Sequence, residues 1–208
     1  MPGWMQRLLG RTPESAARKT AVAWAKHANH KALATPNGFV IEPREASACR
    51  WRMEWGQAQR HYVVGKELRV RAELTSSAEM RLMIIARGLM TTLEQALYDR
   101  SIEGNQTQID EDLPPEMRWL VMFAKVPRSV LGELREQFGF VASPPRAAGL
   151  WLTADVLAQL KRVQDWLPPG APFTLTVQRG RVTLRAGLQE PTAEQLSAAL
   201  AMVEQAHV

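Results

Sequence analysis

Cysteine is almost absent from this chain, since Cys49 is its only one in 208 residues. A single cysteine cannot form an intramolecular disulfide, so no disulfide framework indicates an oxidising compartment. Long apolar runs are missing too. No segment approaches the ~20 apolar residues that a bilayer-spanning helix needs, and residues 4–10 are too short and interrupted for the apolar region of a signal peptide. We therefore expect a cytoplasmic protein without a transmembrane segment.

The usual signatures of catalysis and cofactor binding are also absent. The sequence contains no phosphate-binding Gly-Lys-Ser/Thr loop and no Gly-rich dinucleotide turn. It contains neither a Gly-x-Ser-x-Gly nucleophile motif nor a His-Glu-x-x-His metal helix. We therefore predict no catalytic residues, no cofactor and no metal site. The missing motifs favour a non-enzymatic protein but leave the question of an enzyme open.

Three smaller groups of residues suggest chemistry, and each has a simpler interpretation. His27 and His30 are three apart on a predicted helix, but no further ligand completes a metal shell. Cys49 and His61 lie in neighbouring predicted strands and could form a thiolate and its base, although a lone cysteine is more often a small core residue. The carboxylates of residues 110–112 cannot all face one cation. An enzyme with a Cys/His site is kept only as a minor alternative.

Positive charge is concentrated in the N-terminal quarter. The net charge is +5, and residues 1–52 hold nine Lys or Arg against three Glu. Such a patch can attract nucleic acid or another polyanion, although a solvated basic helix is the commoner explanation. The residues that would contact a polyanion are Arg18, Lys19, Lys26, Lys31, Arg50 and Arg52.

The segment from Leu68 to Tyr98 organises the rest of the chain. Apolar residues alternate with charged ones over 68–74, which predicts a strand with one buried face. Ser76 and Glu79 have the spacing of a capping box, so we predict that a helix begins there. The apolar residues that follow recur at helical spacing up to Tyr98, which indicates a central core helix. A strand over Leu82 to Ala86 is the alternative.

A second alternating segment precedes it. Trp51, Met53 and Trp55 alternate with Arg50, Arg52 and Glu54, and residues 61–64 and 68–74 are predicted to pair across a two-residue loop at Gly65 and Lys66. The meander would have one wet face and one core face. Its polar face would gather Arg50, Arg52, Glu54, Tyr62, Arg69, Arg71 and Glu73. Because the tryptophans lie on the opposite face and the glutamates can pair with the arginines, we interpret this face as solvated.

The remaining elements are predicted from periodicity and capping residues. Alanine-rich sequence predicts a helix over residues 14–33, and residues 116–126 favour a buried strand, with a helix opened by Pro115 as the alternative. Ser129 can cap a helix that runs to Phe138. Helices are also predicted after Thr153 and Thr192, with a hairpin over residues 173–186 between them.

The two halves of the chain resemble each other in three places, in the same order. The matches are Gly38-Phe39-Val40 with Gly139-Phe140-Val141, residues 70–74 with 184–188, and Leu93-Glu94-Gln95-Ala96 with Val203-Glu204-Gln205-Ala206. Either duplication or convergence explains them. We predict a flexible lead (1–13), a first unit (14–103), a connector (104–115) and a second unit (116–208), with one joint domain as the alternative.

These patterns predict an α+β fold of two related units, each an antiparallel sheet or hairpin packed against amphipathic helices. For function, the missing motifs favour a non-enzymatic protein-interaction module, either an adaptor or chaperone-like, with a protein partner of unknown identity. The chaperone comparison is an analogy at the level of element order only. Nucleic-acid or polyanion binding through the basic N-terminal quarter is the competing function.

Overall fold

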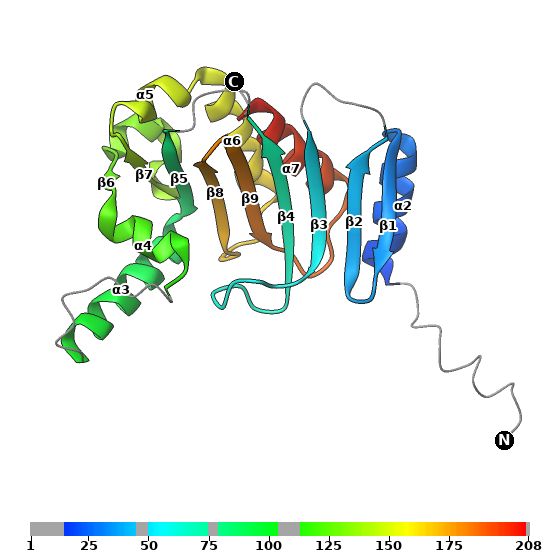
Figure 1. Cartoon of the computed structure of the whole chain (residues 1–208), viewed down its shortest axis with the longest axis horizontal. Helices are drawn as coiled ribbons and strands as arrows, with labels where there is room; N and C mark the ends of the chain where they lie inside the picture. Colours follow the sequence, from blue (N-terminus) through cyan, green and yellow to red (C-terminus); the bar gives the residue numbers. More distant parts are fainter. Residues whose placement is uncertain (1–14, 45–49, 75–78, 104–112, 207–208) are drawn as a thin grey trace, which may run out of the picture.

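A computed structural model describes residues 15–44, 50–74, 79–103 and 113–206. They form an α+β fold built on one nine-stranded antiparallel sheet, with the order β1-β2-β3-β4-β9-β8-β5-β7-β6 (Figure 1). The strands are β1 (His30–Thr35), β2 (Gly38–Pro43), β3 (Trp51–Gln57), β4 (Lys66–Glu73), β5 (Arg81–Ala86), β6 (Ala124–Lys125), β7 (Phe138–Ser143), β8 (Phe173–Gln178) and β9 (Arg181–Gly187). The helices are α2 (Ala16–His27), α3 (Arg87–Glu103), α4 (Pro115–Met122), the 3-10 helix η1 (Arg128–Glu136), α5 (Ala147–Trp151), α6 (Ala154–Trp166) and α7 (Ala193–Gln205).

One face of the sheet is covered by helices along its length. Helices α2, α5, α6 and α7 pack on this face, as Figure 1 shows for the helices behind the strands. The main core lies between the two layers and includes the alternate residues Leu68, Val70 and Ala72 of β4, all at most 1% exposed.

The other face is covered only at one end. Helices α3 and α4 pack on β5 and β7 through a second apolar cluster that includes Met83, Ile85 and Trp119. Strands β3, β4, β9 and β8 carry no helix on this side (Figure 1). These four strands therefore have one buried face and one face without a helix, as the alternation in the sequence predicts.

Several predicted elements are confirmed. Strand β4 has the predicted alternation, and β8 and β9 form the predicted hairpin. Thr153 caps α6 by accepting from the Val156 N–H, and Thr192 forms a complete capping box with Gln195 at the start of α7. These signals are local, so the sequence is sufficient to locate them.

The predicted central helix is wrong in its first part, where the alternative strand is correct. Leu82 to Ile85 are consecutive buried residues of β5, and α3 begins only at Arg87. Both faces of β5 are covered, so its apolar run has no alternation, and such a run cannot be distinguished from a buried helix by periodicity. Ser76 lies outside the described residues, and Glu79 does not cap a helix.

Other boundaries also differ from the prediction. The first helix ends at His27, where Asn29 takes a positive φ of 54°, and residues 30–35 form the edge strand β1. Residues 115–122 form α4 instead of a strand, with Pro115 in its first turn. Residues 61–64 lie in the loop between β3 and β4, which pair directly with each other. The 3-10 helix η1 is interrupted at Gly132, where φ is 54°.

The strand order is palindromic apart from β5. Strands β1 to β4 are mirrored in the sheet by β6, β7, β8 and β9, and β5 is inserted between β8 and β7. Val70 lies directly opposite Leu184, while Leu68 and Ala72 lie opposite Ala186 and Val182. The matching segments of β4 and β9 thus pair with each other, and those of β2 and β7 occupy mirrored places in the strand order. The third matched pair does not follow this symmetry, because α3 and α7 lie on opposite faces of the sheet. The division into two units stays a prediction.

Truncating β5 tests its position in the core. We expect Ile84→Ala to lower the free energy of unfolding by about 2 to 5 kcal/mol, because Ile84 is fully buried. The matched change Ile102→Ala on α3, at a side chain that is 66% exposed, should cost under about 0.5 kcal/mol in the same urea melts. Equal costs at the two positions would contradict this assignment.

Candidate anion-binding face

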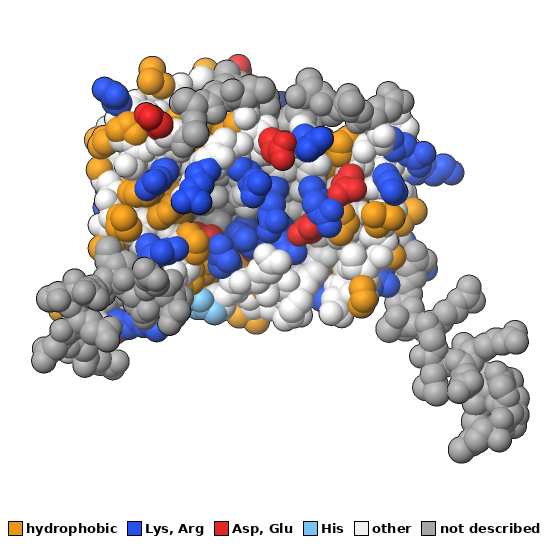
Figure 2. Space-filling view, viewed as in Figure 1, with side chains coloured by type: hydrophobic (Ala, Val, Ile, Leu, Met, Phe, Trp, Pro, Cys, Tyr) orange, Lys and Arg blue, Asp and Glu red, His pale blue; other side chains and the backbone are white. Residues whose placement is uncertain are grey.

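The uncovered side of β3, β4, β9 and β8 is lined by charged and polar side chains, and we call it the open face. It faces the viewer in Figure 2, where Lys and Arg side chains gather over these strands. Its members alternate with the core residues of the same strands. They are Arg52, Glu54, Glu67, Arg69, Arg71, Glu73, Thr174, Thr176, Gln178, Arg181, Thr183 and Arg185.

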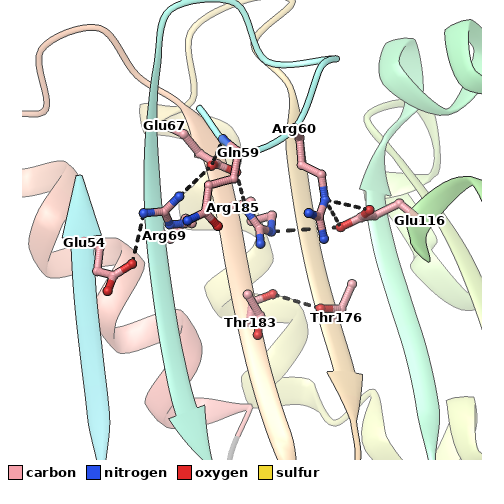
Figure 3. A network of polar contacts seen from close by, with 9 residues as sticks. All are labelled: Glu54, Gln59, Arg60, Glu67, Arg69, Glu116, Thr176, Thr183 and Arg185. Atoms are coloured by element: carbon pink, nitrogen blue, oxygen red, sulfur yellow. Dashed lines mark hydrogen bonds and ion pairs between the residues drawn. The ribbon is translucent and has the colours of Figure 1, made fainter. Parts of the chain in front are cut away.

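A buried carboxylate lies on this face where β4 begins and β9 ends. Glu67 is 0% exposed and accepts from Arg185 at 2.7 Å and from Arg69 at 3.3 Å (Figure 3). It also accepts the backbone N–H of Gln59 at 3.0 Å. Burying a carboxylate costs several kcal/mol unless it is paired and hydrogen-bonded, and Glu67 has both kinds of partner. Its two arginines come from different halves of the chain.

The ion pairs continue outward from Glu67 in both directions. Arg69 donates to Glu54 at 2.9 Å, and Arg185 lies 3.9 Å from Glu116 at the start of α4. The Arg60 Nε donates to both oxygens of Glu116, at 3.1 and 3.0 Å (Figure 3). The network therefore holds both the loop after β3 and helix α4 against the sheet.

The neighbouring Arg52 is neutralised by two glutamates. Its guanidinium donates to Glu42 and to Glu54, each at 2.6 Å. Burial alone would raise the pKa of Glu54, but the hydrogen bond from Arg52 and the charges of Arg69, Arg52 and Arg71 outweigh it, so the pKa is lowered. Glu54 is therefore ionised at neutral pH, and its two carboxylate oxygens bind Arg52 and Arg69.

Arg71 and Arg181 differ from these residues. Among the described residues, neither forms an ion pair or a side-chain hydrogen bond. Arg71 lies directly opposite Arg52 in the sheet, and like charges so placed destabilise a strand pair. Burial lowers the pKa of Arg71 and so do three nearby arginines, although the Glu54 charge acts in the opposite sense. Arginine stays protonated in proteins, so both charges remain.

Two hollows of the open face meet at these two arginines. One has a volume of about 640 Å³ and extends toward Pro43 and Arg50. The other has a volume of about 290 Å³ and extends toward Trp119 on α4. Arg71 and Arg181 line both, so these two arginines lie where the hollows adjoin, and we call the two hollows together the groove.

The polyanion-contact residues predicted from the sequence lie on two sides of the sheet. Arg50, Arg52 and Lys31 lie on the side of the open face. Lys19 and Lys26 are exposed on α2, which packs on the covered side. Arg18 donates to the backbone carbonyls of Thr35, Pro36 and Gly38 and so fixes the β1–β2 turn. The structure therefore does not bring these residues together.

Sequence reasoning missed the contribution of the second half. Arg181 and Arg185 alternate with apolar residues in a hairpin that was correctly predicted, so their exposure on one face could have been inferred. Their position beside Arg71 could not, because nothing local specifies that β9 pairs with β4. The predicted pairing of glutamates with arginines is present for Arg50, Arg52 and Arg69. The face is not simply solvated, however, because the paired Arg69 and Arg185 are each only 7% exposed.

The other candidate groups are separated. His30 is in β1 rather than on a helix, and its ring packs against Trp24 and Trp51, where burial lowers its pKa. His61 is exposed in the loop after β3, and Cys49 and residues 110–112 lie outside the described part of the chain. Within that part, no cluster of three or more His, Cys, Asp or Glu is arranged to hold a metal. None of its helices is both long and apolar enough to cross a membrane.

Comparison with known proteins identifies no family. No protein-family model matches the chain, and no curated protein matches it in sequence. Among solved structures it is similar to the mycobacterial trehalose monomycolate transport factor A, with a TM-score of 0.48 and 9% identity over 90% of each chain.

The buried network predicts a stability effect of Glu67. We expect Glu67→Gln to cost about 3 kcal/mol or more in the free energy of unfolding, because it leaves Arg69 and Arg185 without their shared counter-charge. Glu73→Gln is the matched control on the same strand. Its carboxylate is 57% exposed and 4.0 Å from Arg50, so its loss should cost little. Similar costs in urea melts of both variants would contradict the role of Glu67.

Arg71 should behave in the opposite way. We expect Arg71→Gln to leave stability unchanged or to raise it by about 0.2 to 1 kcal/mol at low salt, because it removes repulsion and breaks no ion pair. The gain should shrink at high salt, where repulsion is screened. Arg69→Gln, which loses bonds to Glu67 and Glu54, should be clearly destabilising in the same urea melts. A cost above about 1 kcal/mol for Arg71→Gln would show that it has a structural partner.

Proposed function

We propose that this protein is a non-enzymatic protein-interaction module whose binding surface is the open face, and that its partner presents an acidic segment. The observation that carries the proposal is the pair Arg71 and Arg181, two guanidinium groups without carboxylate partners among the described residues, at the junction of two hollows. Arginine is enriched at binding hot spots because its planar group makes several directional hydrogen bonds at once.

The surroundings of the pair support this proposal. The groove has a rigid floor, because β4 and β9 pair over their whole length and the Glu67 network ties them together. Carboxylates from a partner would offset the mutual repulsion of Arg71 with Arg69, Arg181 and Arg185. Complementary charge then gives the partner fast association and a defined orientation.

Nucleic-acid binding through the basic N-terminal quarter is the competing function. Phosphate-driven binding weakens steeply with salt, but so would binding of an acidic peptide. Salt dependence alone therefore does not separate the two functions. Position does, because Lys19 and Lys26 lie on α2 on the covered side, whereas Arg71 and Arg181 lie on the open face.

A binding experiment with charge-reversal variants tests the proposal. The probes are a labelled peptide of alternating Glu and Ala, a DNA duplex and a single strand, each measured by fluorescence anisotropy at low and moderate salt. We expect the native chain to bind the acidic peptide, and Arg71→Glu with Arg181→Glu to weaken it about tenfold or more. Lys19→Glu with Lys26→Glu is the charge-matched control and should retain peptide binding.

Two results would contradict the proposal. One is the absence of peptide binding at low salt. The other is peptide binding that the open-face variant leaves unchanged. Binding of the DNA probes that is lost only in the α2 variant would favour the competing function instead.

A further inference from the structure

The geometry of the Arg71 and Arg181 pair indicates which anionic group it fits. In the register of β4 and β9, Arg71 is opposite Thr183 and Glu73 is opposite Arg181. Arg71 and Arg181 are therefore diagonal neighbours on one face, a spacing of ~7–8 Å between Cα atoms that long side chains can bridge. One small anion between the two guanidinium groups can contact both.

The nearby carboxylates are already occupied by other arginines. Glu54 and Glu42 bind Arg52, and Glu116 binds Arg60. Glu73, although opposite Arg181 in register, has its carboxylate 4.0 Å from Arg50. The junction of the two hollows thus holds two positive charges that form no ion pair within the described part of the protein, although Glu54 and Glu73 lie nearby.

Neutral hydrogen-bonding groups complete this site. Thr183 and Gln178 line the same 290 Å³ hollow as the two arginines, and Gln178 lies directly opposite Arg181. Among the described residues, neither the Thr183 hydroxyl nor the Gln178 amide has a hydrogen-bond partner, while the Thr176 hydroxyl donates to the Thr183 carbonyl at 3.3 Å. Two cations with a hydroxyl and an amide match a group with two negative charges and several acceptor oxygens.

A phosphomonoester has these properties and a single carboxylate does not. It carries about −1.5 to −2 charges at neutral pH and three strong acceptor oxygens, so it can accept from two arginines at the same time. A carboxylate can also accept from two arginines, as Glu67 does, but it carries only one charge and has two acceptor oxygens, so it would offset only one of the two arginine charges. The charge and the donor set at the junction therefore favour the phosphoryl group.

We propose that Arg71 and Arg181 bind the phosphomonoester group of a phosphorylated segment of a protein partner. This inference deepens the proposed function and rests on it. A protein segment fits because the groove continues on both sides of the pair, toward Pro43 in one direction and toward Pro115 and Trp119 in the other. The residues that flank the phosphoryl group would occupy these two hollows.

Three matched peptides test the proposal. They share one sequence and carry phosphoserine, Glu or Ser at the central position, and their affinities for the full chain are measured by fluorescence anisotropy. We expect the phosphoserine peptide to bind about tenfold or more tightly than the Glu peptide, and the Ser peptide to bind most weakly. In ¹H–¹⁵N spectra, the side-chain Nε–H signals of Arg71 and Arg181 should shift on addition of the phosphoserine peptide.

Variants separate the role of the site from general charge. Arg71→Gln with Arg181→Gln should abolish the preference for phosphoserine over Glu, and its urea melt should show that it remains folded. Arg71→Lys with Arg181→Lys keeps the charge and loses the bidentate fork, so it should retain only part of the preference. Arg146→Gln with Arg162→Gln, two exposed positions outside the open face, removes the same charge and should leave the preference intact.

The outcomes distinguish this inference from the proposed function. Equal affinity for the phosphoserine and Glu peptides, with binding still dependent on Arg71 and Arg181, would overturn the phosphoryl assignment and leave the proposed function standing. Failure of all acidic peptides to bind would overturn both. Tighter binding of inorganic phosphate or of a 5′-phosphorylated oligonucleotide than of the phosphoserine peptide, dependent on the same arginines, would overturn the protein segment as the source.

Discussion

The structure depends on a carboxylate that is buried where the two halves of the chain meet. Glu67 of β4 binds Arg69 on its own strand and Arg185 on β9, and it has no access to solvent. An ionised group in this position is tolerated only while its partners remain in place, so it ties the register of β4 and β9 to the network around it. Through Arg185, Glu116 and Arg60, the same network positions α4 and the loop after β3.

This network also divides the arginines of the open face into two classes. Arg52, Arg69 and Arg185 are held by carboxylates and act as structural groups. Arg71 and Arg181 form no ion pair within the described structure, and the nearby charge of Glu54 offsets only part of the effect of the other arginines on Arg71. A sheet face that is rich in arginine can be inert where each charge is paired, and a binding surface where it is not. The physical distinction lies in the partners and not in the residue type.

Hydrophobic periodicity identifies a strand correctly where one face is exposed to solvent, and it fails where both faces are buried. The alternation in β3 and β4 correctly places Arg52, Glu54 and Arg69 on the face of the sheet that does not carry the tryptophans. That prediction needs no knowledge of neighbouring strands. Strand β5 is covered by helices on both sides, so its apolar run resembles the start of a core helix. The helix predicted over residues 14–33 wrongly includes the start of β1, because this segment is rich in alanine. In the structure, pairing with β2 overrides that helix propensity.

The sequence by itself determined the local features of this protein. It specified the alternation that makes one face of β4 and β9 polar, the caps of α6 and α7, and the absence of the usual enzymatic motifs. Only the tertiary structure decided which strands are neighbours, and hence that Glu67 meets Arg185 across 118 residues while Arg71 meets another arginine. The reason is that backbone pairing is nearly indifferent to sequence, so strand order is selected by burial of the whole core, and the charges of the open face follow from that selection.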